Sequence, residues 1–146
     1  MPKVVIVTGA SGNMGREVVK KFLVEGYKVI GTVIPNDPVK IDIADSNFEA
    51  VVVNLGDEEN TKQFIGSVVE KYGNIDAAVL TVGGFAMGSI AETTTADIMQ
   101  QYKLNFETAY NTVRPVFTQM IKQNRGRIFL IGSRPGLSMK NGKGMV

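Results

Sequence analysis

The chain has 146 residues, which suits one domain, and its 44% hydrophobic and 21% charged residues are typical of a folded globular protein rather than a disordered one. It holds neither Cys nor His, so we exclude disulfides, thiolate nucleophiles and histidine bases, and we expect no metal site. The net charge of +2 comes from scattered Lys and Arg, and no apolar run is long enough for a membrane span, so we expect a cytoplasmic protein without nucleic-acid or membrane partners.

Short continuous apolar runs, typical of strands buried on both faces of a parallel sheet, alternate with stretches of helical periodicity. In chain order we predict a strand over 4–7, a helix over 14–23 that Gly26 ends, a strand over 28–34, a loop over 35–38, a strand over 50–55, a helix over 57–72, a strand over 75–82, a helix over 96–102, a long helix over 103–123 bent near Pro115, and a strand over 127–132. Residues 41–48 fit neither pattern, and residues 134–146 are predicted to be loop.

Alternation of strand and helix predicts right-handed crossovers and a parallel sheet with helices on both faces. We therefore predict an α/β fold over residues 1–146, a Rossmann-type doubly wound sheet in a three-layer α/β/α arrangement with strand order 3-2-1-4-5.

The loop after the first strand carries three glycines, Gly9, Gly12 and Gly15, in the segment Thr8-Gly9-Ala10-Ser11-Gly12-Asn13-Met14-Gly15. It follows a buried strand and opens an amphipathic helix, the context in which such a loop binds a dinucleotide. Glycines allow a positive φ and a close approach of backbone to diphosphate, and the free amides at the helix start hold its charge. A tight turn without ligand is the alternative, whereas a mononucleotide loop is disfavoured because no Lys-Ser or Lys-Thr pair follows Gly15.

This loop resembles that of the short-chain dehydrogenase/reductase family, Thr-Gly-x-x-x-Gly-x-Gly, except that Asn13 stands where the main branch has Gly. The likeness covers nearly the whole chain: Asn105 on the long helix resembles the family's catalytic Asn, and Ser133 after the last strand resembles its catalytic Ser. The segment around Gly83 and Gly84 is more similar to the dihydropteridine-reductase branch.

The resemblance implies an enzyme that uses NAD or NADP to transfer hydride to or from a small carbonyl or alcohol substrate. It implies catalytic roles for Asn105 and Ser133, and cofactor contacts from Gly9, Ser11, Gly12, Asn13, Met14, Gly15, Asn54, Leu55, Val82 and Gly83. Asn54 stands where the family has an adenine-contacting Asp, although Asn54 and Asp57 also fit a strand-end turn and a helix cap. Because the family's long helix often packs in a dimer interface, we expect a homo-oligomer.

The family's catalytic Tyr-x-x-x-Lys pair occurs nowhere in the sequence. We therefore expect a chain truncated before that pair, with the last strands of the family's sheet missing. A non-catalytic NAD(P)-binding or sensing module is the alternative.

The choice between NAD and NADP stays open at this point. The second strand ends near Thr32, Val33 and Ile34 without the acid that binds the ribose of NAD, and Asp37 comes late, after a proline. NADP is therefore allowed, with Arg16 and Lys40 as candidate cations. Phe85 and Met87 either line the nicotinamide side of the site or close the core.

Overall fold

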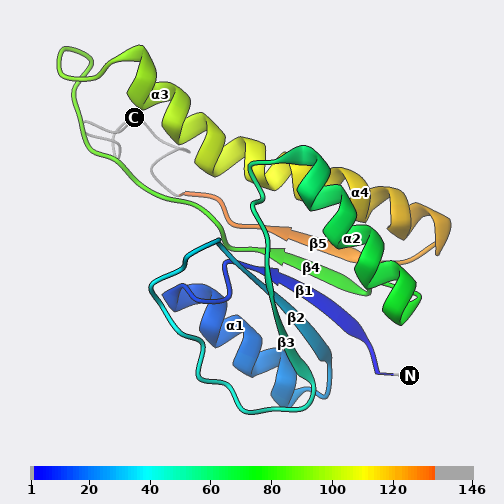
Figure 1. The fold of residues 1–146 in the computed structure, drawn as a ribbon. Helices are drawn as coiled ribbons and strands as arrows, with labels where there is room; N and C mark the ends of the chain where they lie inside the picture. Colours follow the sequence, from blue (N-terminus) through cyan, green and yellow to red (C-terminus); the bar gives the residue numbers. More distant parts are fainter. Residues whose placement is uncertain (1, 134–146) are drawn as a thin grey trace.

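The computed structural model describes residues 2–133, in which five strands form one parallel sheet in the order β3-β2-β1-β4-β5 (Figure 1). The strands are β1 (Val4–Thr8), β2 (Lys28–Val33), β3 (Phe48–Val52), β4 (Ala77–Leu80) and β5 (Arg127–Leu130). The helical segments are α1 (Asn13–Val24), α2 (Glu58–Tyr72), α3 (Thr95–Tyr102), the π-helical turn η1 (Lys103–Glu107) and α4 (Thr108–Lys122). The predicted strand order and parallel directions are confirmed.

The central strand β1 explains why its sequence is continuously apolar. All five of its residues are buried, and successive side chains point to opposite faces of the sheet. Val4 and Ile6 pack into the core beneath α2 and α4, whereas Val5 and Val7 pack into the core beneath α1. Figure 1 shows these three layers, with α1 on one face and α2 and α4 on the other.

The helix ends follow the signals in the sequence. The Asp57 carboxylate accepts a hydrogen bond from the Asn60 N–H (2.9 Å) and caps α2, and Gly73 ends that helix with a φ of +80°. Thr94 and Asp97 form a reciprocal capping box at the start of α3. The helix-cap interpretation of Asp57 is therefore confirmed.

Two elements, the third strand and the long helix, differ from the predictions in an informative way. Strand β3 begins at Phe48, earlier than predicted, and its outer position in the sheet leaves its side chains only partly covered, which weakens the apolar pattern. In the long helix, the departure from α-helical geometry is the π-helical turn η1, while α4 runs through Pro115 as an α-helix. The sequence pattern did not indicate this π-helical turn, which lies about two to three turns before Pro115.

Strand β5 forms the other edge of the sheet and is mostly exposed, including Phe129 and Leu130. The predicted loop over 134–146 lies outside the described residues. Within the described part of the chain, none of the helices has both the length and the apolar character that crossing a bilayer requires.

Candidate functional site

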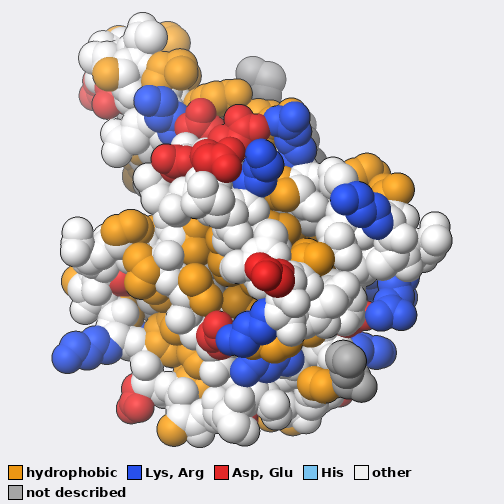
Figure 2. All heavy atoms as spheres, turned by 45° about the vertical axis from the view of Figure 1, so that its right-hand side comes forward, with side chains coloured by type: hydrophobic (Ala, Val, Ile, Leu, Met, Phe, Trp, Pro, Cys, Tyr) orange, Lys and Arg blue, Asp and Glu red, His pale blue; other side chains and the backbone are white. Residues whose placement is uncertain are grey.

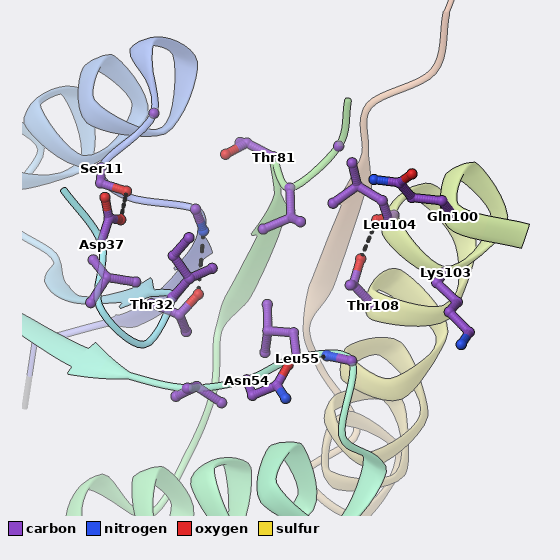
Figure 3. A pocket seen from close by; sticks show the side chains of 18 of the residues that line it. Ser11, Thr32, Asp37, Asn54, Leu55, Thr81, Gln100, Lys103, Leu104 and Thr108 are labelled. Carbon is purple, nitrogen blue, oxygen red and sulfur yellow. Dashed lines mark hydrogen bonds between the residues drawn. The ribbon is translucent and has the colours of Figure 1, made fainter. Parts of the chain in front are cut away.

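A cavity of about 960 Å³ opens at the carboxyl ends of the central strands, where ligands bind in parallel α/β sheets (Figure 3). Its wall is formed by the ends of four neighbouring strands, β3, β2, β1 and β4, and by the continuous helical segment of α3, η1 and α4, here called the α3–α4 rod. The lining residues are Gly9, Ser11, Gly12, Thr32, Val33, Ile34, Asp37, Pro38, Val53, Asn54, Leu55, Gly56, Thr81, Val82, Gly83, Ala96, Met99, Gln100, Lys103, Leu104 and Thr108.

The glycine loop between β1 and α1 turns tightly beside this cavity. Gly9 has a φ of +66°, and its carbonyl accepts the Gly12 N–H at 3.0 Å. A Cβ on Gly15 would collide with the Gly9 carbonyl group, so the third glycine lets α1 start directly against the loop. The expected backbone roles of Gly9 and Gly15 therefore have a geometric basis.

The first turn of α1 presents backbone donors beside the loop. The first helical hydrogen bond runs from the Arg16 N–H to the Gly12 carbonyl, so the amides of Asn13, Met14 and Gly15 have no acceptor within the helix. Within residues 2–133, no side chain caps this helix start. These amides and the positive end of the helix dipole suit a bound anion.

The loop after β2 brings a carboxylate to the same place. The Ser11 hydroxyl of the glycine loop donates to the Asp37 carboxylate, and the Val39 N–H donates to its other oxygen at 2.8 Å (Figure 3). These two donors hold the pKa of the Asp37 carboxyl below its usual value. Asp37, which follows the end of β2 late in the sequence, thus lies in the cavity wall, and Asn36 before it takes a positive φ (58°).

The turn after β3 supplies Asn54 and Leu55 to the cavity wall. The Asn54 side-chain oxygen accepts the Gly56 N–H at 3.1 Å, which makes this a compact strand-end turn. Leu55 is buried, and its carbonyl accepts from the Asn111 amide of α4 at 3.0 Å. Both residues thus have a structural role and also face the cavity.

The end of β4 carries Thr81, Val82 and Gly83 at the opposite side of the glycine loop. Asn105 of η1 lies behind this segment, and its side-chain oxygen accepts the Gly84 N–H at 2.9 Å. The Asn105 amide nitrogen donates back to the Gln101 carbonyl and side-chain oxygens, both at 3.1 Å. Asn105 therefore braces the loop after β4, and it is not among the residues that line the cavity.

The remaining sequence candidates lie away from the cavity wall. Ser133 is exposed beyond β5, and Arg16 and Lys40 are not lining residues. Phe85 and Met87 are exposed in the loop before α3, so within the described residues they do not close the core.

Sequence reasoning missed several residues of this wall. Thr32 and Thr81 carry no motif, and only their position at the carboxyl ends of β2 and β4 could have indicated them. Asp37 and Lys103 are the charged residues of the lining, and Figure 3 places them on opposite sides of the cavity.

Comparisons with known proteins agree with this geometry. The sequence model of the family described as short chain dehydrogenase matches residues 3–145. The chain is 28% identical to an acetoacetyl-CoA reductase of an Acinetobacter species over 97% of its own length and 60% of that protein. It is 25% identical to the 3-oxoacyl-[acyl-carrier-protein] reductase FabG of Escherichia coli over 96% of its own length and 58% of that protein.

Solved structures show the same likeness. ElxO with NADP bound superposes with a TM-score of 0.87 at 28% identity, over 94% of this chain and 58% of that one. A short-chain dehydrogenase from Streptomyces avermitilis gives a TM-score of 0.86 at 26% identity, over 94% of this chain and 52% of that one. The present chain thus spans between about half and three fifths of the length of these relatives.

Proposed function

Because this chain belongs to the short-chain dehydrogenase family, we propose that it binds a nicotinamide dinucleotide in the cavity and forms part of an enzyme that moves hydride to or from a small carbonyl or alcohol substrate. The observation that carries this proposal is the glycine loop: a Cβ on Gly15 would collide with the Gly9 carbonyl group, and the amides that open α1 have no helical acceptor. This is a cradle for a diphosphate. The cofactor found in the ElxO structure, NADP, belongs to the same chemical class.

The geometry of the cavity and of the start of α1 supports the following cofactor contacts. Gly9, Ser11 and Gly12 of the loop, with the amides of Asn13, Met14 and Gly15, hold the diphosphate. Asn54 and Leu55 contact the adenine side, and Val82 and Gly83 contact the nicotinamide side. When bound, the nicotinamide ring supplies or accepts the hydride.

Asn105 and Ser133 are the proposed catalytic contributors from this chain. Ser133 follows β5 at the carboxyl edge of the sheet, where a hydroxyl can polarise a substrate carbonyl by donating a hydrogen bond. Asn105 holds the loop after β4 through the Gly84 N–H, which supports the nicotinamide side of the cavity. A proton donor for the substrate oxygen is not assigned to any residue of this chain.

For the cofactor we propose NAD rather than NADP. The Asp37 carboxylate lies beside Ser11, at the end of the glycine loop that faces β2, where the ribose of the adenosine half is expected. A carboxylate accepts hydrogen bonds from ribose hydroxyls and repels a 2′-phosphate. Lys103, the cation of the described lining, lies on the far wall and does not offset this repulsion (Figure 3).

Two further properties belong to this proposal. Self-association is supported by the exposed aromatic residues of α3, η1 and α4. A cytoplasmic location is compatible with a chain that has no cysteines and therefore needs no oxidising compartment to form disulfides.

The proposal is tested by titrating the protein with NADH and following the nicotinamide fluorescence. The variant Asn13→Asp adds a carboxylate at the first position of α1, which favours the helix but repels a diphosphate. We expect NADH binding to the wild type and a dissociation constant raised about tenfold in the variant. Gln63→Glu, an equal charge change on the exposed face of α2, is the control and should bind as the wild type does.

Two results would count against the function. One is a wild type that leaves the fluorescence of both NADH and NADPH unchanged at millimolar concentration. The other is equal affinity of the Asn13→Asp variant and the wild type, because binding would then take place away from the helix start.

A further inference from the structure

Three threonines lie at or beside the carboxyl ends of three neighbouring strands: Thr32 on β2, Thr8 on β1 and Thr81 just after β4. We propose that Thr32 and Thr81 are positioning residues, whose hydroxyls clasp the glycine loop from both sides and hold it in the shape that binds the diphosphate. This inference rests on the proposed dinucleotide binding and assigns a role to two residues outside the glycine motif.

Thr32 holds the loop from the β2 side. Its side chain is buried, and its hydroxyl oxygen accepts the Gly9 N–H at 3.2 Å, as the dashed line in Figure 3 marks. Its carbonyl accepts the Ala10 N–H at 2.9 Å. The first two residues of the loop are therefore bonded to a single residue of the neighbouring strand.

Thr81 holds the loop from the β4 side through a reciprocal pair of bonds with Thr8. The Thr81 hydroxyl donates to the Thr8 carbonyl at 2.6 Å, and the Thr8 hydroxyl oxygen accepts the Thr81 N–H at 3.0 Å. Thr8 directly precedes Gly9, so this pair fixes the point where the loop leaves β1.

The Thr81 hydroxyl also lies where side chains on two of the glycines would come. Its oxygen would lie 3.0 Å from a Cβ on Gly15 and 3.4 Å from a Cβ on Gly9, so Thr81 stands beside both ends of the loop. The loop thus runs between Thr32 on one side and Thr81 on the other, and both side chains line the cavity.

The hydrogen bonds from Thr32 and Thr81 to the loop, here called the clasp, matter for binding. Glycines give a backbone without such bonds many conformations, and ordering that backbone when the ligand binds costs affinity. Bonds at Gly9, Ala10 and Thr8 remove that freedom before the ligand arrives. Replacing either threonine by valine keeps the branched shape and exchanges the hydroxyl for a methyl group, which can neither donate nor accept a hydrogen bond. The expected consequence is weaker binding of the diphosphate rather than a changed core.

The test compares Thr32→Val and Thr81→Val with Thr32→Ser and Thr81→Ser, which restore the hydroxyl. The dissociation constants for NADH and NADPH are measured by fluorescence, and the melting temperature by circular dichroism. The control is Thr112→Val, because Thr112 is also buried and donates to a backbone carbonyl (Thr108, 2.8 Å) but lies in α4 outside the cavity lining. We expect each valine variant at the clasp to raise the dissociation constant about five- to tenfold, each serine variant to stay within about twofold of the wild type, and the control to change only the melting temperature.

A second measurement, amide hydrogen exchange, tests the clasp without any ligand. Thr32→Val should speed exchange at the Gly9 N–H and Thr81→Val at loop amides near Thr8, whereas Thr112→Val should leave both unchanged. Valine variants with wild-type affinity and exchange would overturn the clasp, as would serine variants that fail to restore affinity. If the wild type binds neither nucleotide but the exchange pattern is as expected, the two threonines order the loop, whereas their role in binding and the proposed function both fail.

Discussion

The proposed preference for NAD over NADP depends on Asp37, which lines the cavity beside Ser11. Replacing it with Asn removes the charge that we propose to face the adenosine ribose, so Asp37→Asn should weaken NADH binding and strengthen NADPH binding, changing the ratio of the two dissociation constants about tenfold or more. Asp42→Asn, the same charge change at an exposed position outside the cavity lining, should leave that ratio unchanged. Fluorescence titration with both nucleotides measures the ratio.

The lowered pKa of Asp37 defines the pH range over which its carboxylate keeps its charge. The Ser11 hydroxyl and the Val39 N–H lower that pKa, so the carboxylate stays charged as the pH falls toward the usual Asp value. The wild-type dissociation constant for NADH, which has no 2′-phosphate, should therefore be the same at pH 5 as at pH 8. A preference for NADPH in the wild type, or a ratio that Asp37→Asn does not change, would contradict this role.

Spacing along the chain predicted the glycine loop but not Asp37. Gly9 and Gly15 follow a buried strand directly, so their geometry depends on neighbours in sequence. Asp37 reaches Ser11 from 26 positions away through a loop in which Asn36 has a positive φ, and no local pattern encodes such a return. Asn105 was proposed by resemblance, and it accepts the Gly84 N–H from within the π-helical turn, which propensities do not predict.

At the scale of elements, Glu49 joins the edge strand β3 to α2. Its carboxylate accepts from Lys71 Nζ at 2.8 Å and from the Tyr72 hydroxyl at 2.6 Å, and these donors lower its pKa from the usual 4.5. Because the pKa of Glu49 is lower in the folded than in the unfolded chain, its ionised carboxylate stabilises the fold at pH values above the unfolded-state pKa. This stabilisation is lost as the pH falls through the folded-state pKa. Glu49→Gln should therefore reduce the free energy of unfolding by up to about 1 kcal/mol at pH 7, because the pair is partly exposed.

Urea unfolding at several pH values checks this expectation. The difference between the wild type and Glu49→Gln should shrink below pH 4.5 and be present at all higher values up to neutrality. Glu70→Gln, at an exposed position on the same helix, is the control. A difference that persists unchanged in acid would mean that packing, rather than charge, joins β3 to α2.

The elements themselves show what periodicity can and cannot determine. The burial of β1 on both faces gives an unmistakable apolar run, and the caps at Asp57, Gly73 and Thr94 give clear helix ends. The predicted boundaries of β3 lie too late in the sequence. As an edge strand β3 is partly exposed, so its apolar pattern begins later than its hydrogen bonds do.

The whole molecule leaves one long apolar stripe uncovered within its described part. The stripe follows the α3–α4 rod and consists of Tyr102, Phe106, Tyr110, Phe117 and Ile121, all exposed. Tyr102 stacks on Phe106 and Phe106 on Tyr110, with ring centroids 5.1 and 6.0 Å apart. Figure 2 shows further hydrophobic side chains exposed between charged ones on one face of the molecule. Contiguous apolar surface of this kind marks protein–protein contacts.

Self-association through this stripe is the expected behaviour of the molecule as a whole. Phe117 is 55% exposed near the middle of α4, so Phe117→Lys places a charge in the stripe without disturbing the core. We expect sedimentation to show a concentration-dependent dimer for the wild type and a dimer dissociation constant raised about tenfold or more for the variant. Val24→Lys, which changes a residue that is 80% exposed at the end of α1, is the matched control and should sediment as the wild type. A wild type that stays monomeric at every concentration, or a Val24→Lys effect equal to that of Phe117→Lys, would show that the stripe is not the contact surface.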